Sequence, residues 1–173
     1  MDITVIRGDI TAQDVDAVVT AANRGLRGGG GVDAAVHAAA GPELLRACRP
    51  LAPCPTGSAV ITSAFDLAPV RWVIHAVGPR AGDTDAERLL ASAYVSSLQR
   101  ADEVEARSVA FPSISTGSYG YPGGKAATVS VDALLGATCE VERVLLVAFD
   151  NTTADLWRAA LAWAHDGSAS AAL

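Results

Sequence analysis

Asp33 and His37 are the residues whose types and spacing most directly suggest acid–base chemistry. They stand four positions apart in an Ala-rich stretch, so a helix would place both side chains on one face. Four glycines, Gly28–Gly31, precede the pair. A carboxylate beside such a loop is suited to orient a water molecule next to an anionic ligand. Two simpler interpretations stay open: an ordinary surface pair, or an aspartate that complements the helix dipole.

The glycine run lies between an apolar strand, Ala17–Ala21, and the helix that carries Asp33. Glycine adopts positive φ without strain and lets the backbone approach a ligand closely. The N–H groups of the first helical turn then face any anion bound there. A flexible linker is the alternative, but linkers rarely separate a buried strand from an amphipathic helix. The pattern favours a phosphate-binding loop.

A second glycine-rich loop, Pro112–Gly124, also lies between a predicted strand and a helix. Its serines, threonine and glycines supply small donors, and Tyr119 and Tyr121 supply planar surfaces. Two such loops at strand ends suit the nucleotide crevice of an open α/β sheet. A long turn built from turn-prone residues is the simpler interpretation of this loop alone.

Asp9 follows the first predicted strand, and Phe149 ends the last one. Asp9 suits either the capping of a following turn or hydrogen bonding to a purine amino group. Phe149 suits either stacking on a base or closure of the core.

The remaining candidates for chemistry are assigned to the core. His75 lies inside an apolar strand and is expected to be a buried, hydrogen-bonded histidine. Cys48, Cys54 and Cys139 include no CxxC pair, which favours core residues or free thiols over a disulfide or a zinc site.

Apolar Val- and Ile-rich runs alternate with Ala- and Leu-rich stretches, which predicts an α/β fold whose sheet is covered by helices on both faces. Asp83 or Thr84 is expected to cap the long helix, and Thr152 or Thr153 the last one. The expected strands are Ile3–Arg7, Ala17–Ala21, Ala59–Ser63, Arg71–Val77, Ser108–Phe111 and Arg143–Phe149. The expected helices are Gly31–Ala40, Pro42–Cys48, Ala86–Asp102, Gly123–Gly136 and Thr153–Asp166.

The chain has 173 residues and the size of one domain, here residues 1–166, followed by a small polar tail, 167–173, that is expected to fray. A net charge of −6 with a single lysine argues against binding to a nucleic-acid backbone. No apolar stretch approaches the roughly 20 residues of a membrane span. The first residues do not resemble a secretory signal, so a cytoplasmic protein is expected.

Together, these motifs resemble the macrodomain family, and specifically its MacroD-type branch. The similarity covers nearly the whole chain, in five segments that occur in the family's order: Gly8–Thr11, Ala21–Leu45, Cys48–Thr62, Val73–Pro79 and Phe111–Pro122. The resemblance implies a three-layer α/β/α sandwich around a mixed sheet, with ADP-ribose lying across the crest of that sheet.

Site residues follow from the resemblance. Asp9 would bind the adenine amino group, Ile10 would help to place the ring, and Phe149 would lie against it. The diphosphate would be held from one side by the N–H groups of Gly30, Gly31 and Val32, and from the other by Ser115, Thr116, Gly117, Ser118 and Tyr119.

The resemblance also implies the chemistry. Asn23 would bind the distal ribose, Asp33 would sit near its anomeric carbon, and His37 would support Asp33. The family's Asn-Ala-Ala-Asn motif begins here with Thr20 instead, a shorter residue with a single donor. This departure leaves ADP-ribose binding intact and is expected to shift substrate preference or slow turnover.

The implied function is hydrolysis of mono-ADP-ribose from acidic side chains of modified proteins, with O-acetyl-ADP-ribose as a second substrate and no cofactor or metal. A non-catalytic reader of ADP-ribose is the alternative, favoured by Thr20. A phosphatase acting on ADP-ribose 1″-phosphate would use the same pocket. The alanine- and arginine-rich composition suggests a bacterial source. No feature of the sequence requires an oligomer, so a monomer is expected.

Overall fold

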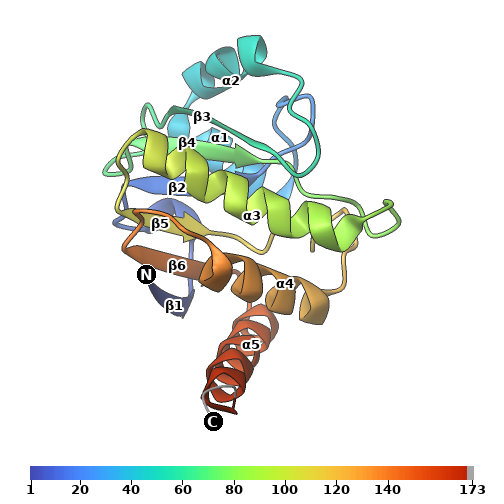
Figure 1. Cartoon of the computed structure of the whole chain (residues 1–173). Helices are drawn as coiled ribbons and strands as arrows, with labels where there is room; N and C mark the ends of the chain where they lie inside the picture. The colour runs from blue at the N-terminus through green and yellow to red at the C-terminus, as the bar shows by residue number, and fades with distance from the viewer. Residues whose placement is uncertain (171–173) are drawn as a thin grey trace.

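The computed structural model describes residues 1–170, along which strands and helices alternate (Figure 1). The strands are β1 (Asp2–Arg7), β2 (Ala17–Ala21), β3 (Ala59–Ser63), β4 (Trp72–Ala76), β5 (Ser108–Phe111) and β6 (Arg143–Ala148). The α-helices are α1 (Gly31–Ala40), α2 (Pro42–Cys48), α3 (Ala86–Glu103), α4 (Gly123–Gly136) and α5 (Asn151–Ser170). Short 3-10 turns, η1 (Ile10–Ala12) and η2 (Arg49–Leu51), complete the described chain.

Within residues 1–170 the strands form one mixed sheet in the order β1-β6-β5-β2-β4-β3. All neighbours are parallel except the edge strand β3, which runs antiparallel to β4. The first strand therefore lies beside the last one, with Asp2 opposite Arg143 and Arg7 opposite Ala148. The expected α/β class and mixed sheet are confirmed.

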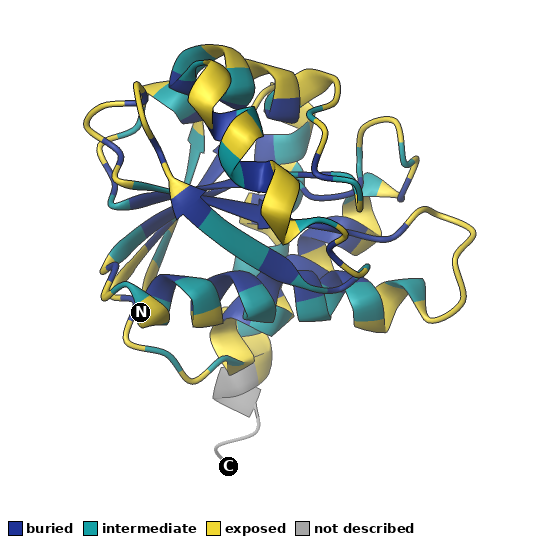
Figure 2. Ribbon diagram, turned by 90° about the horizontal axis from the view of Figure 1, so that it is seen from above, coloured by how far each residue is buried: buried dark blue, intermediate teal, exposed yellow. Residues whose placement is uncertain are grey.

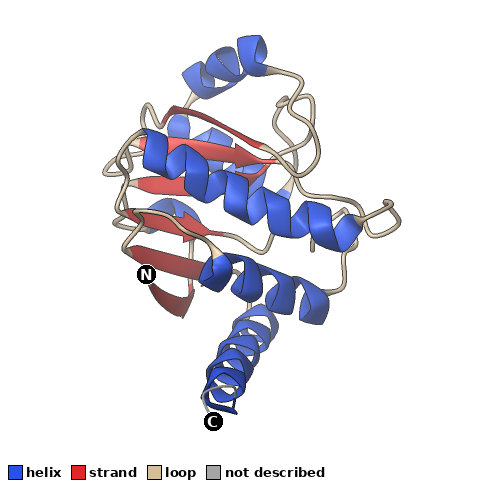
Figure 3. Ribbon diagram, viewed as in Figure 1, coloured by secondary structure: helices blue, strands red, loops and turns tan. Residues whose placement is uncertain are grey.

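Helices cover both faces of the sheet, which makes the three expected layers (Figures 1 and 3). On one face, Val36 of α1 and Leu44 of α2 pack against Val18 and Val73 of the sheet. On the other face, α3, α4 and α5 enclose a larger core that contains Tyr94, Phe111 and Trp157. In Figure 2 the buried residues lie between the layers and the exposed ones on the outer helix faces and loops.

Burial on both faces explains the composition of β2. Ala17, Val18, Val19 and Thr20 are all buried, and Val18 and Val19 belong to the cores on opposite sides of the sheet. A parallel strand enclosed in this way reads as a continuous apolar run. Thr20 is the polar exception in that run.

Two predicted helix caps are wrong. The N-cap of α3 is Asp85, in a left-handed conformation, while Asp83 accepts a hydrogen bond from the Arg80 N–H. Helix α5 begins at Asn151, because the Asp150 carboxylate accepts from the Thr153 N–H at 2.8 Å. The threonines predicted to cap α5 therefore lie inside the first turn of that helix.

Helix α5 also continues to Ser170, four residues beyond its predicted end at Asp166. The remainder of the predicted tail, residues 171–173, lies outside the described residues. No helix in the described part of the chain is both long and apolar enough to span a membrane.

Candidate active site

The loops singled out in the sequence meet at one edge of the sheet. From β2 the chain turns outward to β3 and β4, and after β4 the helix α3 carries it across to β5, on the other side of β2. The carboxyl ends of β2 and β5 therefore flank a topological switch point, where open α/β sheets form their ligand crevices. The loop after β2 contains the glycine run, and the loop after β5 contains Ser115 to Tyr119.

The glycine run opens the start of α1 to that crevice. Gly30 is the N-cap of the helix and makes no side-chain cap, so the first-turn N–H groups keep their hydrogen-bonding capacity. Gly31 has a φ of 58°, a left-handed conformation that favours glycine. A β-carbon at Gly30 or Gly31 would find no described atom within 4 Å. The space in front of these N–H groups suits an anion.

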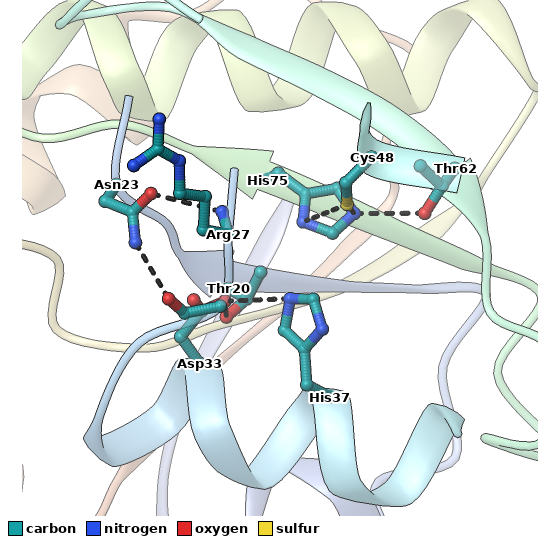
Figure 4. Close-up of polar contacts among 9 residues, drawn as sticks. Thr20, Asn23, Arg27, Asp33, His37, Cys48, Thr62 and His75 are labelled. Atoms are coloured by element: carbon teal, nitrogen blue, oxygen red, sulfur yellow. Dashed lines mark hydrogen bonds and ion pairs between the residues drawn. The ribbon is translucent and has the colours of Figure 1, made fainter. Parts of the chain in front are cut away.

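Asp33 follows in the first turn of α1 and is 2% exposed (Figure 4). Burial raises the pKa of its carboxyl group, while a hydrogen bond from Thr20, the nearby His37 and the Gly29 backbone act in the opposite direction. The His37 Nε2 lies 3.7 Å from Asp33 Oδ1. A carboxylate held dry at the rim of an anion site is a suitable general base.

Thr20 contacts Asp33 rather than the open crevice. Its side chain is fully buried, and its hydroxyl donates to Asp33 Oδ1 at 2.8 Å. The threonine at this position thus places a hydrogen-bond donor next to the buried carboxylate.

Asn23 organises the loop that follows β2. Its Nδ2 donates to the Gly28 carbonyl at 3.0 Å, and its Oδ1 accepts from the Arg27 N–H at 3.2 Å. A β-carbon at Gly29 would lie 3.5 Å from Asp33 Oδ2 and 3.7 Å from Asn23 Nδ2. The amide and the carboxylate therefore border the same glycine.

The loop after β5 supplies the opposite wall. Ser115 has a φ of 69°, is buried, and its hydroxyl has no hydrogen-bond partner among the described residues. It packs so closely on Gly78 that a β-carbon there would overlap Ser115 Oγ. Thr116 donates to the Ser113 carbonyl at 3.0 Å, and Arg80 lies over the Tyr119 ring at 5.3 Å from its centroid. Gly117 and Ser118 form the exposed tip of the loop.

Asp9 and Phe149 follow the paired ends of β1 and β6, where Gly8 N donates to the Ala148 carbonyl, so both lie at this end of the sheet. Asp9 does cap the turn η1, as its Oδ1 accepts from the backbone N–H of Thr11 at 2.8 Å and from its hydroxyl at 2.7 Å. Phe149 is 89% exposed, so it does not close the core. Ile10 is buried beneath this end.

The prediction of a core histidine at position 75 is confirmed. His75 is fully buried, its Nε2 lies 3.0 Å from Thr62 Oγ1, and burial lowers its pKa to about 3. It is therefore neutral in the folded protein.

Cys48 lies next to His75, and this buried contact is one that the sequence alone does not predict. Its sulfur lies 3.6 Å from His75 Nε2, and burial together with the charge of Asp33 raises its pKa to about 11. Ligand-type atoms of His37, Cys48 and His75 all lie within 4.8 Å of one another. These residues come from α1, α2 and β4, so no spacing in the sequence links them. All three cysteines are free thiols, as expected.

Comparison with known sequences gives consistent matches. The Macro domain family matches residues 19–130 of the chain. An O-acetyl-ADP-ribose deacetylase of Klebsiella pneumoniae (strain 342) is 52% identical over 167 residues, which cover 91% of this chain and 95% of that protein. A Macro domain-containing protein of Lactiplantibacillus plantarum is 48% identical, covering 94% of this chain and 97% of that protein.

Solved structures give the same result. A mutant of the Oceanobacillus iheyensis macrodomain with ADPR matches with a TM-score of 0.90 and 38% identity, over 95% of this chain and 94% of that one. The Trypanosoma brucei macrodomain in complex with ADP-ribose matches with a TM-score of 0.83 and 34% identity, over 92% of this chain and 68% of that one.

Proposed function

Because this chain belongs to the Macro domain family, we propose that it binds ADP-ribose and hydrolyses its esters. The substrates are mono-ADP-ribose on acidic side chains of modified proteins, and O-acetyl-ADP-ribose. The observation that carries the proposal is the buried Asp33 carboxylate, with its raised pKa, beside an uncapped, glycine-lined helix start. The deacetylase name of the Klebsiella pneumoniae relative supports an ester substrate.

The crevice accommodates the ligand in one direction. The exposed Phe149 ring stacks on the adenine, and Asp9 accepts from its amino group. The diphosphate lies between two walls, where it meets the N–H groups of Gly30, Gly31 and Val32 on one side and the segment Ser115–Tyr119 on the other. The buried, unpartnered hydroxyl of Ser115 is an available donor for it. This order leaves the distal ribose beside Asn23 and Asp33.

Asp33 then acts as the general base. It accepts a proton from a water molecule whose oxygen attacks the anomeric carbon of the distal ribose. The bond from that carbon to the ester oxygen breaks, and the side chain leaves as a carboxylate, which needs little acid assistance. General-base catalysis of this kind contributes roughly 10²- to 10⁴-fold to the rate. Thr20 and His37 hold the carboxylate in position.

The test is release of ADP-ribose from a protein mono-ADP-ribosylated on glutamate, with wild type, Asp33→Ala and Thr20→Asn compared. We expect release by wild type, a loss of about 100-fold or more in Asp33→Ala, and ADP-ribose affinity within tenfold of wild type by calorimetry, about 1.4 kcal/mol. Tight ADP-ribose binding without release from either ester would make the protein a reader. In that case, a gain of release in Thr20→Asn would identify Thr20 as the residue that silences hydrolysis.

A further inference from the structure

An open cavity of about 520 Å³ lies immediately beyond Asn23, outside the crevice described above. One wall is Gly25–Arg27 in the loop after β2, and the other is formed by Leu45 of α2, Arg49 of η2 and Pro53. The cavity thus combines two cationic side chains with an apolar floor.

Two hydrogen bonds hold the walls of this cavity next to Asn23, the residue proposed to bind the distal ribose. The Arg27 N–H donates to Asn23 Oδ1 at 3.2 Å, and the Arg24 carbonyl accepts from the Cys54 N–H at 2.9 Å. The first bond joins the cavity wall to the residue proposed to bind the distal ribose. The second joins the two walls to each other. In the view of Figure 4, the Arg27 guanidinium lies above Asn23, on the side away from Asp33.

The charge of the cavity is opposite to that of the molecule. Residues 23–53 contain four arginines, one aspartate and one glutamate, whereas the whole chain has a net charge of −6. Arg46 pairs with Glu43, and Asp33 is buried at the other side of Asn23. Among the described residues, Arg27 and Arg49 are exposed and make no ion pair. Two unneutralised guanidinium groups therefore face this one opening.

We propose that this cavity is a subsite for the polypeptide that carries the ADP-ribose, and that it selects an acidic segment next to the modified side chain. The inference rests on the proposed hydrolase function and adds the substrate class to it. Guanidinium groups bind carboxylates with two parallel hydrogen bonds, and opposite charge raises the rate of encounter. Leu45 and Pro53 offer apolar surface to the aliphatic part of the segment.

The test uses two peptides mono-ADP-ribosylated on one glutamate, flanked either by aspartates or by alanines, with O-acetyl-ADP-ribose as a substrate without a polypeptide. For wild type we expect kcat/KM about five- to tenfold higher on the acidic peptide at low salt. Arg49→Glu is expected to abolish this preference, Arg49→Lys to restore part of it, and Arg158→Glu on α5 to keep it. Deacetylation of O-acetyl-ADP-ribose should stay within about twofold in all variants, since rim charges act locally.

Equal kcat/KM on the two peptides in wild type, or a preference that survives in Arg49→Glu, would overturn the subsite. If wild type hydrolyses neither peptide, the proposed hydrolysis of protein-linked ADP-ribose fails, and hydrolysis of O-acetyl-ADP-ribose is judged separately. The Kd values of the two intact peptides then decide the subsite by the same comparison. Binding that favours the acidic peptide and depends on Arg49 would support the subsite in a reader.

Discussion

The hydroxyl of Thr20 donates a hydrogen bond of 2.8 Å to Oδ1 of Asp33, and both side chains are closed off from solvent. The bond stabilises the ionised carboxylate, whereas burial destabilises it and dominates. Thr20 and His37 therefore both lower the pKa of Asp33 and offset part of the increase that burial causes.

Replacing Thr20 by valine tests this relationship, because it removes the donor and keeps the branched shape. The pKa of Asp33 should rise further, so the acid limb of kcat/KM against pH should move to higher pH. We expect a stability loss of about 1–3 kcal/mol from the unsatisfied carboxylate. Thr20→Ser keeps the hydroxyl and should retain the wild-type limb; an identical profile for all three proteins would exclude the tuning role.

Asp33→Asn should keep or raise the stability of the fold at neutral pH. Since the folded state raises the pKa of Asp33 above its ordinary value of 3.8, stability is lost as pH rises from there through the folded pKa. At neutral pH the ionised carboxylate thus costs stability, and an amide removes that cost. We expect Tm at pH 7.5 to be equal or higher, by about 2–4 °C per kcal/mol, and the gain to vanish below about pH 4. A lower Tm at pH 7.5 would contradict this; Asp132→Asn, on exposed α4 surface, is the control.

His75 should set part of the acid sensitivity of the fold. Its pKa is about 3 in the folded protein, against 6.5 for an unperturbed histidine, so its contribution is complete above pH 6.5 and is lost as pH falls toward 3. Between pH 7 and 4.5 this amounts to about 2–3 kcal/mol of unfolding free energy. Denaturant unfolding at both pH values should show a smaller difference for His75→Gln than for wild type. Equal differences would show that other groups cause the acid loss.

Gly30→Glu should block ADP-ribose while leaving the fold intact. Its φ is −93°, which any residue adopts, and no described atom lies within 4 Å of the added β-carbon. The carboxylate would then occupy the space proposed for the diphosphate. We expect calorimetry to show a loss of affinity of about two orders of magnitude, near 2.7 kcal/mol, with an unchanged Tm. Gly82→Glu, another open position, should bind normally; normal binding by Gly30→Glu would place the ligand elsewhere.

The boundaries that depend on local chemistry could be predicted from the sequence. Helix α1 begins within the glycine run and ends at Ala40 before Gly41-Pro42, and β2 has the bounds of its apolar run. The predicted start of α5 is wrong because Asp150, outside the predicted helix, supplies the cap. Local preference alone does not decide among neighbouring aspartates and threonines as cap residues.

The contacts that build the site could not be predicted in the same way. Spacing along α1 indicates that His37 lies near Asp33, but the bond from Thr20 requires the specific crossing of α1 over β2. The buried contact of Cys48 with His75 and the arginine-lined cavity also join residues from separate elements. Such side-chain geometry is set by packing between layers, which periodicity does not encode.

The pairing of β1 with β6 also determines when the site can form during synthesis. Within the described chain, β1 has β6 as its sheet neighbour, and residues 143–148 leave the ribosome after the other five strands of the sheet. Until then, Phe149 is missing from the end of the sheet that carries Asp9, and β5 presents an unpaired edge that invites association with other chains. A nascent or truncated chain that lacks β6 therefore cannot assemble the end of the crevice proposed for adenine, so complete ligand binding requires β6 to have been synthesised.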